Sequence, residues 1–473
     1  MTYINALKKI NSFPRMTGAP TLERMRLLCK YLGDPQKKLK FVHIAGTNGK
    51  GSCAAMLDSI LRKAGYRTGR YISPYILDFR ERMTVCGEMI RHEELCIHTD
   101  TVIKAVSQMS SDIERAREGL EVPYQIPKLI LDGKVSDTPV QFEVVTAIGF
   151  LYFLSAGCDV VLLECGLGGK FDATNVIDPP LAAVIMSIGL DHTELLGDRV
   201  EIIAAEKCGI IKNGTQEIIS YPQSPSVMSV ISDACVKANA RISVPLKKEL
   251  KILHASFGGL DFVYKDRKYR TRLAASYQMN NAATVIEAAE ALTRVGMNIS
   301  KEDIYGGLAE TWFPARFEVL GVSPTVIVDG AHNVHGIAAL CESIDMVSDI
   351  IRGKVVFTIG MLKDKDPKSS LAPFVELVRS GRIKTDKIIT LTPESPRAMD
   401  ADELAFTLVE MLEGEVEILP ISESGKKRSK ELISALSTIH ADDAVISFGS
   451  LYLASDVRLI LTEFLEGYKP IFD

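Results

Sequence analysis

The sequence predicts an α/β protein built from two domains, residues 1–296 and residues 297–473. Short apolar runs alternate with helical patterns along most of the chain, as in folds with parallel sheets. This alternation restarts near Gly296, after a stretch with a hairpin-like pattern. The length of 473 residues also exceeds what one ordinary hydrophobic core supports.

The first predicted strand, residues 40–45, leads through a glycine-rich turn into a helix. The spacing of the apolar side chains of that helix places them on one face: Cys53, Met56, Leu57, Ile60, Leu61 and Ala64. Gly65 is suited to ending the helix. The apolar run 144–154 predicts a buried helix, and the polar residues 110–140 predict an excursion over the surface.

The remaining elements follow the same alternation. Further strands of the first domain are expected at residues 70–73, 159–164 and 182–188. Residues 243–274 have the hairpin-like pattern, with Gly258-Gly259 between two runs, and residues 281–295 are helical again. The second domain is expected to contain strands at residues 325–329, 354–360, 387–391, 416–419 and 444–448. Substrates usually bind in clefts outside the carboxyl ends of such strands.

Composition excludes several classes of protein. A net charge of −5 and a pI near 6.0 argue against a protein whose main task is to bind nucleic acid. No stretch approaches the ~20 apolar residues of a membrane span, and the N-terminal residues lack the apolar core of a signal peptide. The nine cysteines form no CxxC pair, which favours free thiols in a reducing cytoplasm. We therefore expect a cytoplasmic enzyme.

Residues 43–52 predict a phosphate-binding loop between a strand and a helix. Backbone N–H groups in such a turn, together with the helix N-terminus, form a cradle for an anion. Lys50 adds a charge for the β- and γ-phosphates, and Thr47 or Ser52 offers a hydroxyl. The general GxxxxGK[ST] spacing is not met, because Gly51 separates Lys50 from Ser52. The alternative is a glycine-rich turn with an exposed lysine.

Several ordered blocks of sequence resemble the folylpolyglutamate synthase/dihydrofolate synthase family, within the Mur ligase superfamily. The first is GTNGKGS, residues 46–52, and the others are residues 73–76 with 81–82, 142–147, 164–169 with 172–175, 187–192, 206–212, 316–318, 329–333 and 449–452. A single block would be weak support, whereas this many in order is specific. Tyr75, Lys170, Cys208 and Phe448 depart from the commonest family pattern.

The resemblance implies a P-loop ATPase domain with a folate site, followed by a smaller Rossmann-like glutamate ligase domain. It implies an ADP-forming ligase that adds L-glutamate to dihydropteroate or a reduced folate through an acyl phosphate. ATP and two Mg2+ ions are the expected cofactors, and a monovalent cation stays open. A monomer without nucleic-acid or membrane partners is expected.

By the same similarity, the loop Gly46, Thr47, Asn48, Gly49, Lys50, Gly51 and Ser52 binds ATP. Ser73 and Glu164 are expected to hold one Mg2+, and Glu164 and His192 a second; His192 bonded to its own loop is the alternative. Lys207 matches the family's carbamylated lysine. It lies in a largely apolar helical run, residues 198–211, and burial lowers a lysine's pKa and leaves more neutral amine. An ordinary salt bridge to Glu201 or Glu206 is the alternative.

The remaining expected site residues also come from the resemblance. Arg316 and Asn281 match residues near the nucleotide phosphates, Asp329 and His332 match nucleotide and glutamate contacts, and Ser450 matches a glutamate contact. Tyr75, Arg82 and Asp172 are expected to contact the substrate. Strand-end residues such as Asp329 and Ser450 also often cap the next helix, so a capping role is the alternative.

Two rival functions stay open. A cell-wall Mur ligase would carry a UDP-binding domain before the ATPase, and the phosphate loop begins only about 45 residues into this sequence. A non-catalytic nucleotide-binding paralogue would have no need of Lys50, Ser73, Glu164, His192 and Lys207 together. Both considerations favour the folate ligase.

Overall fold

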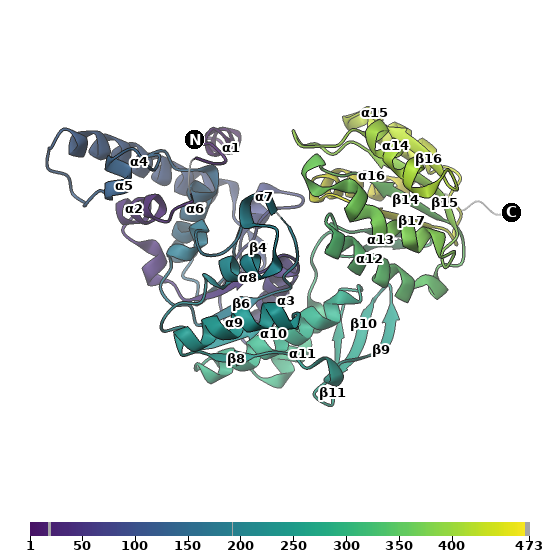
Figure 1. Cartoon of the computed structure of the whole chain (residues 1–473), viewed down its shortest axis with the longest axis horizontal. Helices are drawn as coiled ribbons and strands as arrows, with labels where there is room; N and C mark the ends of the chain where they lie inside the picture. The colour runs from purple at the N-terminus through teal and green to yellow at the C-terminus, as the bar shows by residue number, and fades with distance from the viewer. Residues whose placement is uncertain (18–19, 192, 469–473) are drawn as a thin grey trace. The chain divides into compact units, whose positions relative to one another are not determined.

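The computed structural model describes residues 1–17, 20–191 and 193–468, shown as a ribbon in Figure 1. Contacts divide the chain into two compact units. Unit 1 comprises Met1–Leu246 and Ala283–Gly307, and unit 2 comprises Lys247–Ala282 and Leu308–Asp473. This division differs from the predicted boundary after residue 296, because the hairpin region packs with the C-terminal residues. That boundary itself stays a prediction.

Unit 1 is organised around a sheet in the order β4-β3-β2-β5-β1-β6-β7-β8. Its strands are β1 (Phe41–Ala45), β2 (Thr68–Tyr71), β3 (Met83–Val85), β4 (Glu88–Met89), β5 (Val160–Glu164), β6 (Ala182–Ile185), β7 (Glu217–Ser220) and β8 (Arg241–Ser243). Within this order, β2, β5, β1, β6, β7 and β8 pair in parallel. Strands β3 and β4 extend the sheet beyond β2 with antiparallel pairing. Every residue of β1 and β5 is buried, as expected for parallel strands covered on both faces.

The helices of unit 1 are α1 (Tyr3–Asn11), α2 (Glu23–Tyr31), η1 (Pro35–Lys38), α3 (Lys50–Lys63), η2 (Phe79–Arg82), α4 (His92–Arg117), α5 (Lys128–Leu131), α6 (Gln141–Ser155), η3 (Ala173–Val176), α7 (Thr193–Leu196), α8 (Val200–Cys208) and α9 (Pro225–Ala238). Helix α3 packs on β1, β2 and β5, and α6 packs on α4. Helices α10 (Tyr277–Arg294) and α11 (Lys301–Glu310) each cross a division between the units.

Unit 2 contains two sheets. The first is an antiparallel sheet of β9 (Lys251–Ser256), β10 (Gly259–Tyr264) and β11 (Arg267–Thr271). The second has the order β12-β13-β17-β14-β15-β16, with bounds β12 (Glu318–Val322), β13 (Thr325–Val328), β14 (Val355–Ile359), β15 (Thr385–Leu391), β16 (Glu417–Ile421) and β17 (Ala444–Phe448). All of its pairings are parallel except that of β12 with β13.

The helices of unit 2 complete the Rossmann-like alternation. They are η4 (Lys247–Glu249), α12 (Val334–Met346), η5 (Ser348–Ile350), η6 (Lys363–Lys365), α13 (Pro367–Arg379), α14 (Ala401–Leu412), α15 (Gly425–Ala435) and α16 (Leu451–Gly467). A buried apolar cluster joins the strands to α12, α13 and α14, and within it Phe357, Phe374 and Phe448 are in edge-to-face contact.

The two-unit α/β prediction is confirmed, and the differences are local. The excursion predicted for residues 110–140 is wrong in part, since α4 continues to Arg117 and α5 buries Ile130. A long helix whose surface mixes apolar and polar residues lacks a clear helical repeat of apolar positions, and the prediction of a helix depends on that repeat. The hairpin region gains a third strand, β11, because Lys265 and Asp266 adopt the positive φ angles of a tight turn.

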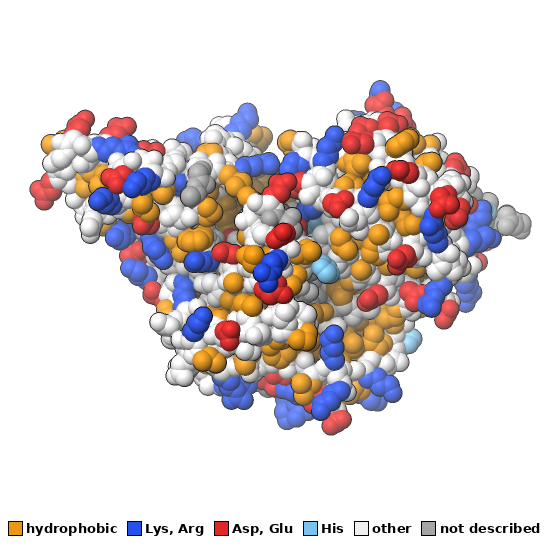
Figure 2. All heavy atoms as spheres, viewed as in Figure 1, with side chains coloured by type: hydrophobic (Ala, Val, Ile, Leu, Met, Phe, Trp, Pro, Cys, Tyr) orange, Lys and Arg blue, Asp and Glu red, His pale blue; other side chains and the backbone are white. Residues whose placement is uncertain are grey.

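The surface matches the composition. On the face drawn in Figure 2, acidic and basic side chains are interspersed, and no continuous basic field covers it. Within the residues that the structure describes, no helix is both long and apolar enough to cross a bilayer. All nine cysteines lie in the described ranges as free thiols.

Candidate active site

The predicted phosphate loop joins the end of β1 to the start of α3. Gly49 precedes the helix with a φ of 85°, and a side chain on Gly46 would come within 2.7 Å of Met186 Cβ. Both positions therefore require glycine. The loop is anchored to the neighbouring strand connection, because Thr47 N donates to Ser187 O at 2.7 Å and the Thr47 hydroxyl donates to Gly189 O at 3.0 Å.

Two lysine side chains converge on one carbonyl of this loop. Lys50 Nζ donates to Gly46 O at 3.0 Å and to Thr47 O at 3.1 Å, and Lys207 Nζ donates to the same Gly46 O at 2.9 Å. Lys207 is 4% exposed. Burial, with the charge of Lys50 beside it, lowers the pKa of Lys207 to about 7. A large share of Lys207 is therefore a neutral amine near neutral pH.

The expected metal ligands follow the carboxyl ends of adjacent strands. The register pairs Ile44 of β1 with Glu164, the last residue of β5, and Tyr71 of β2 with Leu163. Ser73, two residues after β2, and Glu164 therefore lie at the same edge of the sheet as the phosphate loop. Glu164 is 4% exposed, and Ser73 Oγ is buried with no hydrogen-bond partner among the described residues. Such an unsatisfied oxygen is costly unless a ligand completes it.

His192, the fourth expected ligand, lies outside the described residues. Among those that are described, no group of three His, Cys, Asp or Glu side chains is placed to hold a metal. The expected set does not depend on such a group, since it combines Ser73, Glu164 and Lys207 with His192. Its assignment stays a prediction.

Asp172 supports the loop that follows Glu164. Its Oδ2 accepts from Gly166 N at 3.0 Å and Leu167 N at 2.9 Å, and its Oδ1 accepts from Thr174 N and Oγ1. Burial raises the pKa of Asp172 although these bonds oppose the shift. The carboxylate thus fixes the glycine-rich turn, and the substrate contact predicted for Asp172 stays a prediction.

Arg82 and Tyr75 face each other across a loop held by Glu81. The Glu81 carboxylate accepts from the backbone N–H groups of Ile76, Leu77 and Asp78 at 2.9–3.0 Å. The Arg82 guanidinium lies 5.4 Å from the ring centre of the exposed Tyr75. Arg82 Nε and Nη1 are buried without hydrogen-bond partners in the described part of the chain. A half-buried guanidinium with two buried, unused donors suits a carboxylate ligand.

In unit 2, Asp329 is the centre of a buried hydrogen-bond network. Its carboxylate accepts from Tyr277 Oη at 2.9 Å, from Phe317 N at 2.7 Å and from Ala331 N at 2.7 Å. Burial raises the pKa of Asp329, and Arg316 opposes this shift. The network fixes the backbone at Phe317, directly after Arg316, and Arg316 Nη1 donates to Ala315 O at 3.0 Å.

The other expected residues of unit 2 have local roles in the structure. Ser450 caps α16, because its hydroxyl accepts from Tyr452 N at 3.2 Å. His332 Nδ1 lies 2.7 Å from Gly330 O. Asn281, 3% exposed, donates from Nδ2 to Gln278 Oε1 at 2.9 Å. The capping alternative thus holds for Ser450, and the ligand contacts predicted for all three stay predictions.

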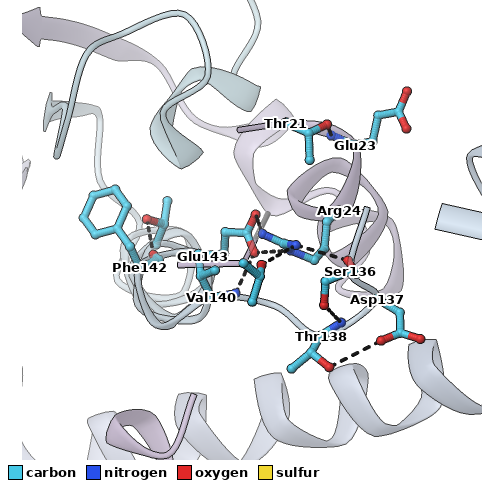
Figure 3. Close-up of polar contacts among 11 residues, drawn as sticks. Thr21, Glu23, Arg24, Ser136, Asp137, Thr138, Val140, Phe142 and Glu143 are labelled. Atoms are coloured by element: carbon cyan, nitrogen blue, oxygen red, sulfur yellow. Dashed lines mark hydrogen bonds and ion pairs between the residues drawn. The ribbon is translucent and has the colours of Figure 1, made fainter. Parts of the chain in front are cut away.

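An ion pair between α2 and α6 was not among the sequence predictions. Figure 3 shows the guanidinium of Arg24, from α2, aimed at the carboxylate of Glu143, from α6. Arg24 Nε and Glu143 Oε2 are 2.6 Å apart, and both residues are 4% exposed. Arg24 Nη1 also donates to Thr17 Oγ1 and Ser136 O, so the pair ties two loops to α6. Glu143 falls in a family block, but no sequence signal pairs it with Arg24.

Comparisons with known proteins agree with this architecture. Residues 315–451 match the family model described as "Mur ligase, glutamate ligase domain". The dihydrofolate synthase/folylpolyglutamate synthase of Bacillus subtilis is 35% identical over 93% of this chain and 94% of its own length. The protein of the same name from Escherichia coli is 31% identical over 95% of this chain and 93% of its own.

Solved structures extend the likeness to the whole fold. Folylpolyglutamate synthase from Mycobacterium tuberculosis, complexed with ADP and AMPPCP, has a TM-score of 0.79 at 27% identity and covers 99% of this chain and 100% of its own. Escherichia coli FolC in complex with DHPP and ADP has a TM-score of 0.77 at 27% identity, covering 98% of each chain. Similarity of this extent in sequence and fold shows that the chain belongs to the dihydrofolate synthase/folylpolyglutamate synthase family.

Proposed function

We propose that this chain uses ATP to join L-glutamate to the carboxylate of dihydropteroate, of a reduced folate, or of both. The observation that carries the proposal is the convergence of Lys50 and Lys207 on Gly46 O, beside a buried strand-end carboxylate, Glu164. Membership of the family supplies the reaction class, and the names of the relatives supply the substrates. ADP and phosphate are the expected by-products.

The reaction has two chemical steps. First, a carboxylate oxygen of the pterin substrate bonds to the γ-phosphorus of ATP, and the bond to the β-phosphate oxygen breaks, which releases ADP. Second, the glutamate amine bonds to the carbonyl carbon and loses a proton, while the bond from that carbon to phosphate breaks. The backbone N–H groups of the loop and Lys50 would stabilise the phosphate charge in the first step.

The residues present fit magnesium. Mg2+ prefers hard oxygen ligands, and the buried unsatisfied Ser73 Oγ lies at the same strand edge as the Glu164 carboxylate. When bound there, Mg2+ would neutralise charge on the phosphates. His192 remains the proposed partner of Glu164 for a second ion.

Lys207 is proposed to carry a carbamate. Its neutral amine would bond to the carbon of CO2 and release a proton, which replaces a cation by an anion near the phosphate loop. Burial and the adjacent Lys50 favour this exchange, since a protonated Lys207 places a second positive charge on the same carbonyl oxygen. Within the described part of the chain, Lys207 donates to Gly46 O and forms no ion pair with a carboxylate, so the alternative salt bridge to Glu201 or Glu206 has no support.

The proposed substrate contacts differ in what supports them, either observations in the structure or family motifs alone. Arg82 is the best supported, because two of its buried donors lack partners, and Tyr75 packs beside it. Arg316, Asp329, His332, Ser450 and Asn281 are proposed from the family motifs. The network around Asp329 would set the position of Arg316. A cytoplasmic monomer remains the expectation for the protein as a whole.

Purified protein incubated with ATP, Mg2+ and glutamate tests the proposal. Dihydropteroate, tetrahydrofolate and a UDP-muramoyl peptide would be offered separately, and mass spectrometry would detect added glutamate. We expect glutamate on one or both pterins and none on the UDP compound. Lys50→Met should abolish turnover, whereas the exposed helical variant Lys237→Met should not. Product on the UDP compound alone, or on no substrate, would refute the proposal.

A further inference from the structure

Arg316 lies between two residues whose backbone is left-handed, in a turn of unit 2. Ala315 has a φ of 49° and Phe317 a φ of 53°. Such angles bring Cβ close to the following carbonyl oxygen, which costs free energy for alanine and phenylalanine but not for glycine. Both residues are buried, whereas Arg316 between them is half-buried. Strained conformations of this kind persist only where the surrounding structure holds them, so each residue should have a group that holds it.

Two buried carboxylates hold the strained residues, one for each. Phe317 N donates to Asp329 Oδ2 at 2.7 Å, and Ala315 N donates to Glu318 Oε2 at 3.0 Å. Glu318 begins β12 and Asp329 follows β13, and these two strands pair with each other. Both carboxylates are almost fully buried, at 7% and 3% exposed. The left-handed turn therefore depends on two acceptors at neighbouring strand ends.

Glu318 is itself fixed by Arg458, a residue of α16. Arg458 Nε lies 3.0 Å from both carboxylate oxygens of Glu318, and Arg458 Nη2 donates to Oε1 at 2.9 Å. The side chains are 22% and 5% exposed. A guanidinium that contacts a carboxylate through two nitrogens restrains the plane of that carboxylate. Arg458 thus keeps Glu318 Oε2 within reach of Ala315 N.

The strained turn in its turn determines where the Arg316 guanidinium lies. Arg316 Nη1 donates to Ala315 O at 3.0 Å, and the same oxygen accepts from Gly330 N at 2.9 Å. A Cβ on Gly330 would lie 2.6 Å from Arg316 Nη1, so the guanidinium lies directly against this glycine. On another side, the ring centre of Phe313 is 5.7 Å from the guanidinium carbon. The guanidinium is therefore placed by the carbonyl of a strained residue.

We propose that Glu318, fixed by Arg458, is a positioning residue that holds Ala315 in its left-handed conformation and so places Arg316. The inference rests on the proposed function, in which Arg316 contacts the nucleotide phosphates. Without the oxygen of Glu318, Ala315 should relax towards a negative φ, and the carbonyl that accepts from Arg316 should turn away. The competing explanation is that the Glu318–Arg458 pair serves only to join α16 to β12.

Two substitutions of Glu318 separate these explanations. Glu318→Met and Glu318→Gln both remove the ion pair and have nearly the same volume, but only glutamine keeps an oxygen that can accept from Ala315 N. We expect kcat to fall at least about tenfold in Glu318→Met and at most about threefold in Glu318→Gln, with the KM for the pterin near the wild-type value in both. Equal losses of kcat, or no loss in either variant, would overturn the proposal.

Ala315→Gly provides a rescue that an ion pair with a purely structural role would not show. Glycine adopts a positive φ without the Cβ penalty, so the left-handed turn no longer needs the acceptor of Glu318. Ala315→Gly/Glu318→Met should therefore recover kcat at least about threefold over Glu318→Met. A double variant as slow as Glu318→Met would show that strain at Ala315 is not what Glu318 controls.

Urea unfolding without substrates tests the same coupling independently of turnover. Ala315→Gly relieves strain in the wild type and in Glu318→Gln, whereas in Glu318→Met the strain is already relaxed. The substitution should therefore shift the urea midpoint less favourably in Glu318→Met than in the other two backgrounds. Should Glu318→Met not fold, Arg458→Gln, which frees Glu318 from its fixed position, takes its place with the same expectation.

The outcomes distinguish this proposal from the proposed function. Equal midpoint shifts in all backgrounds, with glutamate ligation intact, would refute only the hold on Ala315. Unequal shifts in a protein that ligates glutamate to no pterin would refute only the proposed function. Unequal shifts together with a wild-type kcat in Glu318→Met would show that the turn is held but does not position Arg316 for the reaction.

Discussion

Among single residues, Lys207 has the most distinctive environment, because its amine is almost completely buried. Its folded-state pKa of about 7 lies below the ordinary value of 10.5. Between these values the unfolded chain binds more protons than the folded chain, so the stability contributed by this site rises with pH across that window and is lowest below it.

Lys207→Met therefore has a pH-dependent effect that can be measured. Compared with the wild type in CO2-free buffer, the variant should gain most free energy of unfolding at and below about pH 7, and the gain should shrink towards about pH 10. Urea unfolding at several pH values measures it. Lys237→Met, at an exposed position on α9, should show no such trend. A gain for Lys207→Met that stays constant with pH would show that the lysine is not desolvated.

Arg82 provides a second prediction for a single residue. Arg82→Gln should raise KM for the pterin substrate about tenfold or more, because hydrogen bonds to a charged group contribute ~1.5–3 kcal/mol. The KM for ATP should stay near the wild-type value. Arg91→Gln, at an exposed arginine paired with Glu94, is the matched control. An unchanged pterin KM would remove Arg82 from the substrate site.

Between elements, the Arg24–Glu143 pair joins α2 to α6 in a buried setting. Arg24→Met should destabilise unit 1 by about 3–5 kcal/mol at neutral pH, since it leaves a buried carboxylate without its cation. Burial already holds the pKa of Glu143 above its ordinary value, so the loss should lessen as the pH falls and Glu143 takes up a proton.

The companion variants separate charge from packing. Arg24→Met/Glu143→Gln should recover part of the lost stability, and Arg117→Met, which removes a half-exposed pair with Asp137, should cost no more than about 1 kcal/mol. Chemical denaturation measures all three. If the double variant were as unstable as Arg24→Met at neutral pH, the uncompensated charge would not be the cause.

The packing of α11 on α3 gives another prediction between elements. A Cβ on Gly307 would lie 2.5 Å from Ile60 Cα, in the backbone of α3. Gly307→Ala should thus force the helices apart at a cost of about 1–3 kcal/mol and lower Tm. Gly467→Ala, near the end of α16 where nothing lies within 4 Å, should leave Tm unchanged or slightly higher. Equal Tm values for both variants would contradict the close approach.

Strand ends were predictable because the parallel strands are continuous apolar runs that stop at polar residues such as Glu164. The spatial order of the strands was not, since the register that places Ser73 beside Glu164 depends on pairing between distant segments. The ion pair of Arg24 with Glu143 was unpredictable for the same reason. Asp172 illustrates another limit: a motif marks it, but only coordinates show that its carboxylate holds the backbone of Gly166 and Leu167.

In the molecule as a whole, two α/β units divide the proposed chemistry. Unit 1 contains the phosphate loop and the expected metal ligands, and unit 2 contains Arg316 and the Asp329 network. The proposed reaction begins in unit 1, where the γ-phosphoryl group is transferred to the substrate carboxylate. The proposed reaction therefore requires transfer of the γ-phosphoryl group to the substrate carboxylate.

Oxygen-isotope transfer tests that step directly. The pterin substrate, labelled with oxygen-18 in its carboxylate, would be turned over with unlabelled ATP, and the released phosphate would be examined by mass spectrometry. If the carboxylate attacks the γ-phosphorus, one labelled oxygen should appear in each phosphate released, in proportion to the amide formed. Amide formation with unlabelled phosphate would contradict the acyl-phosphate mechanism and with it the central claim.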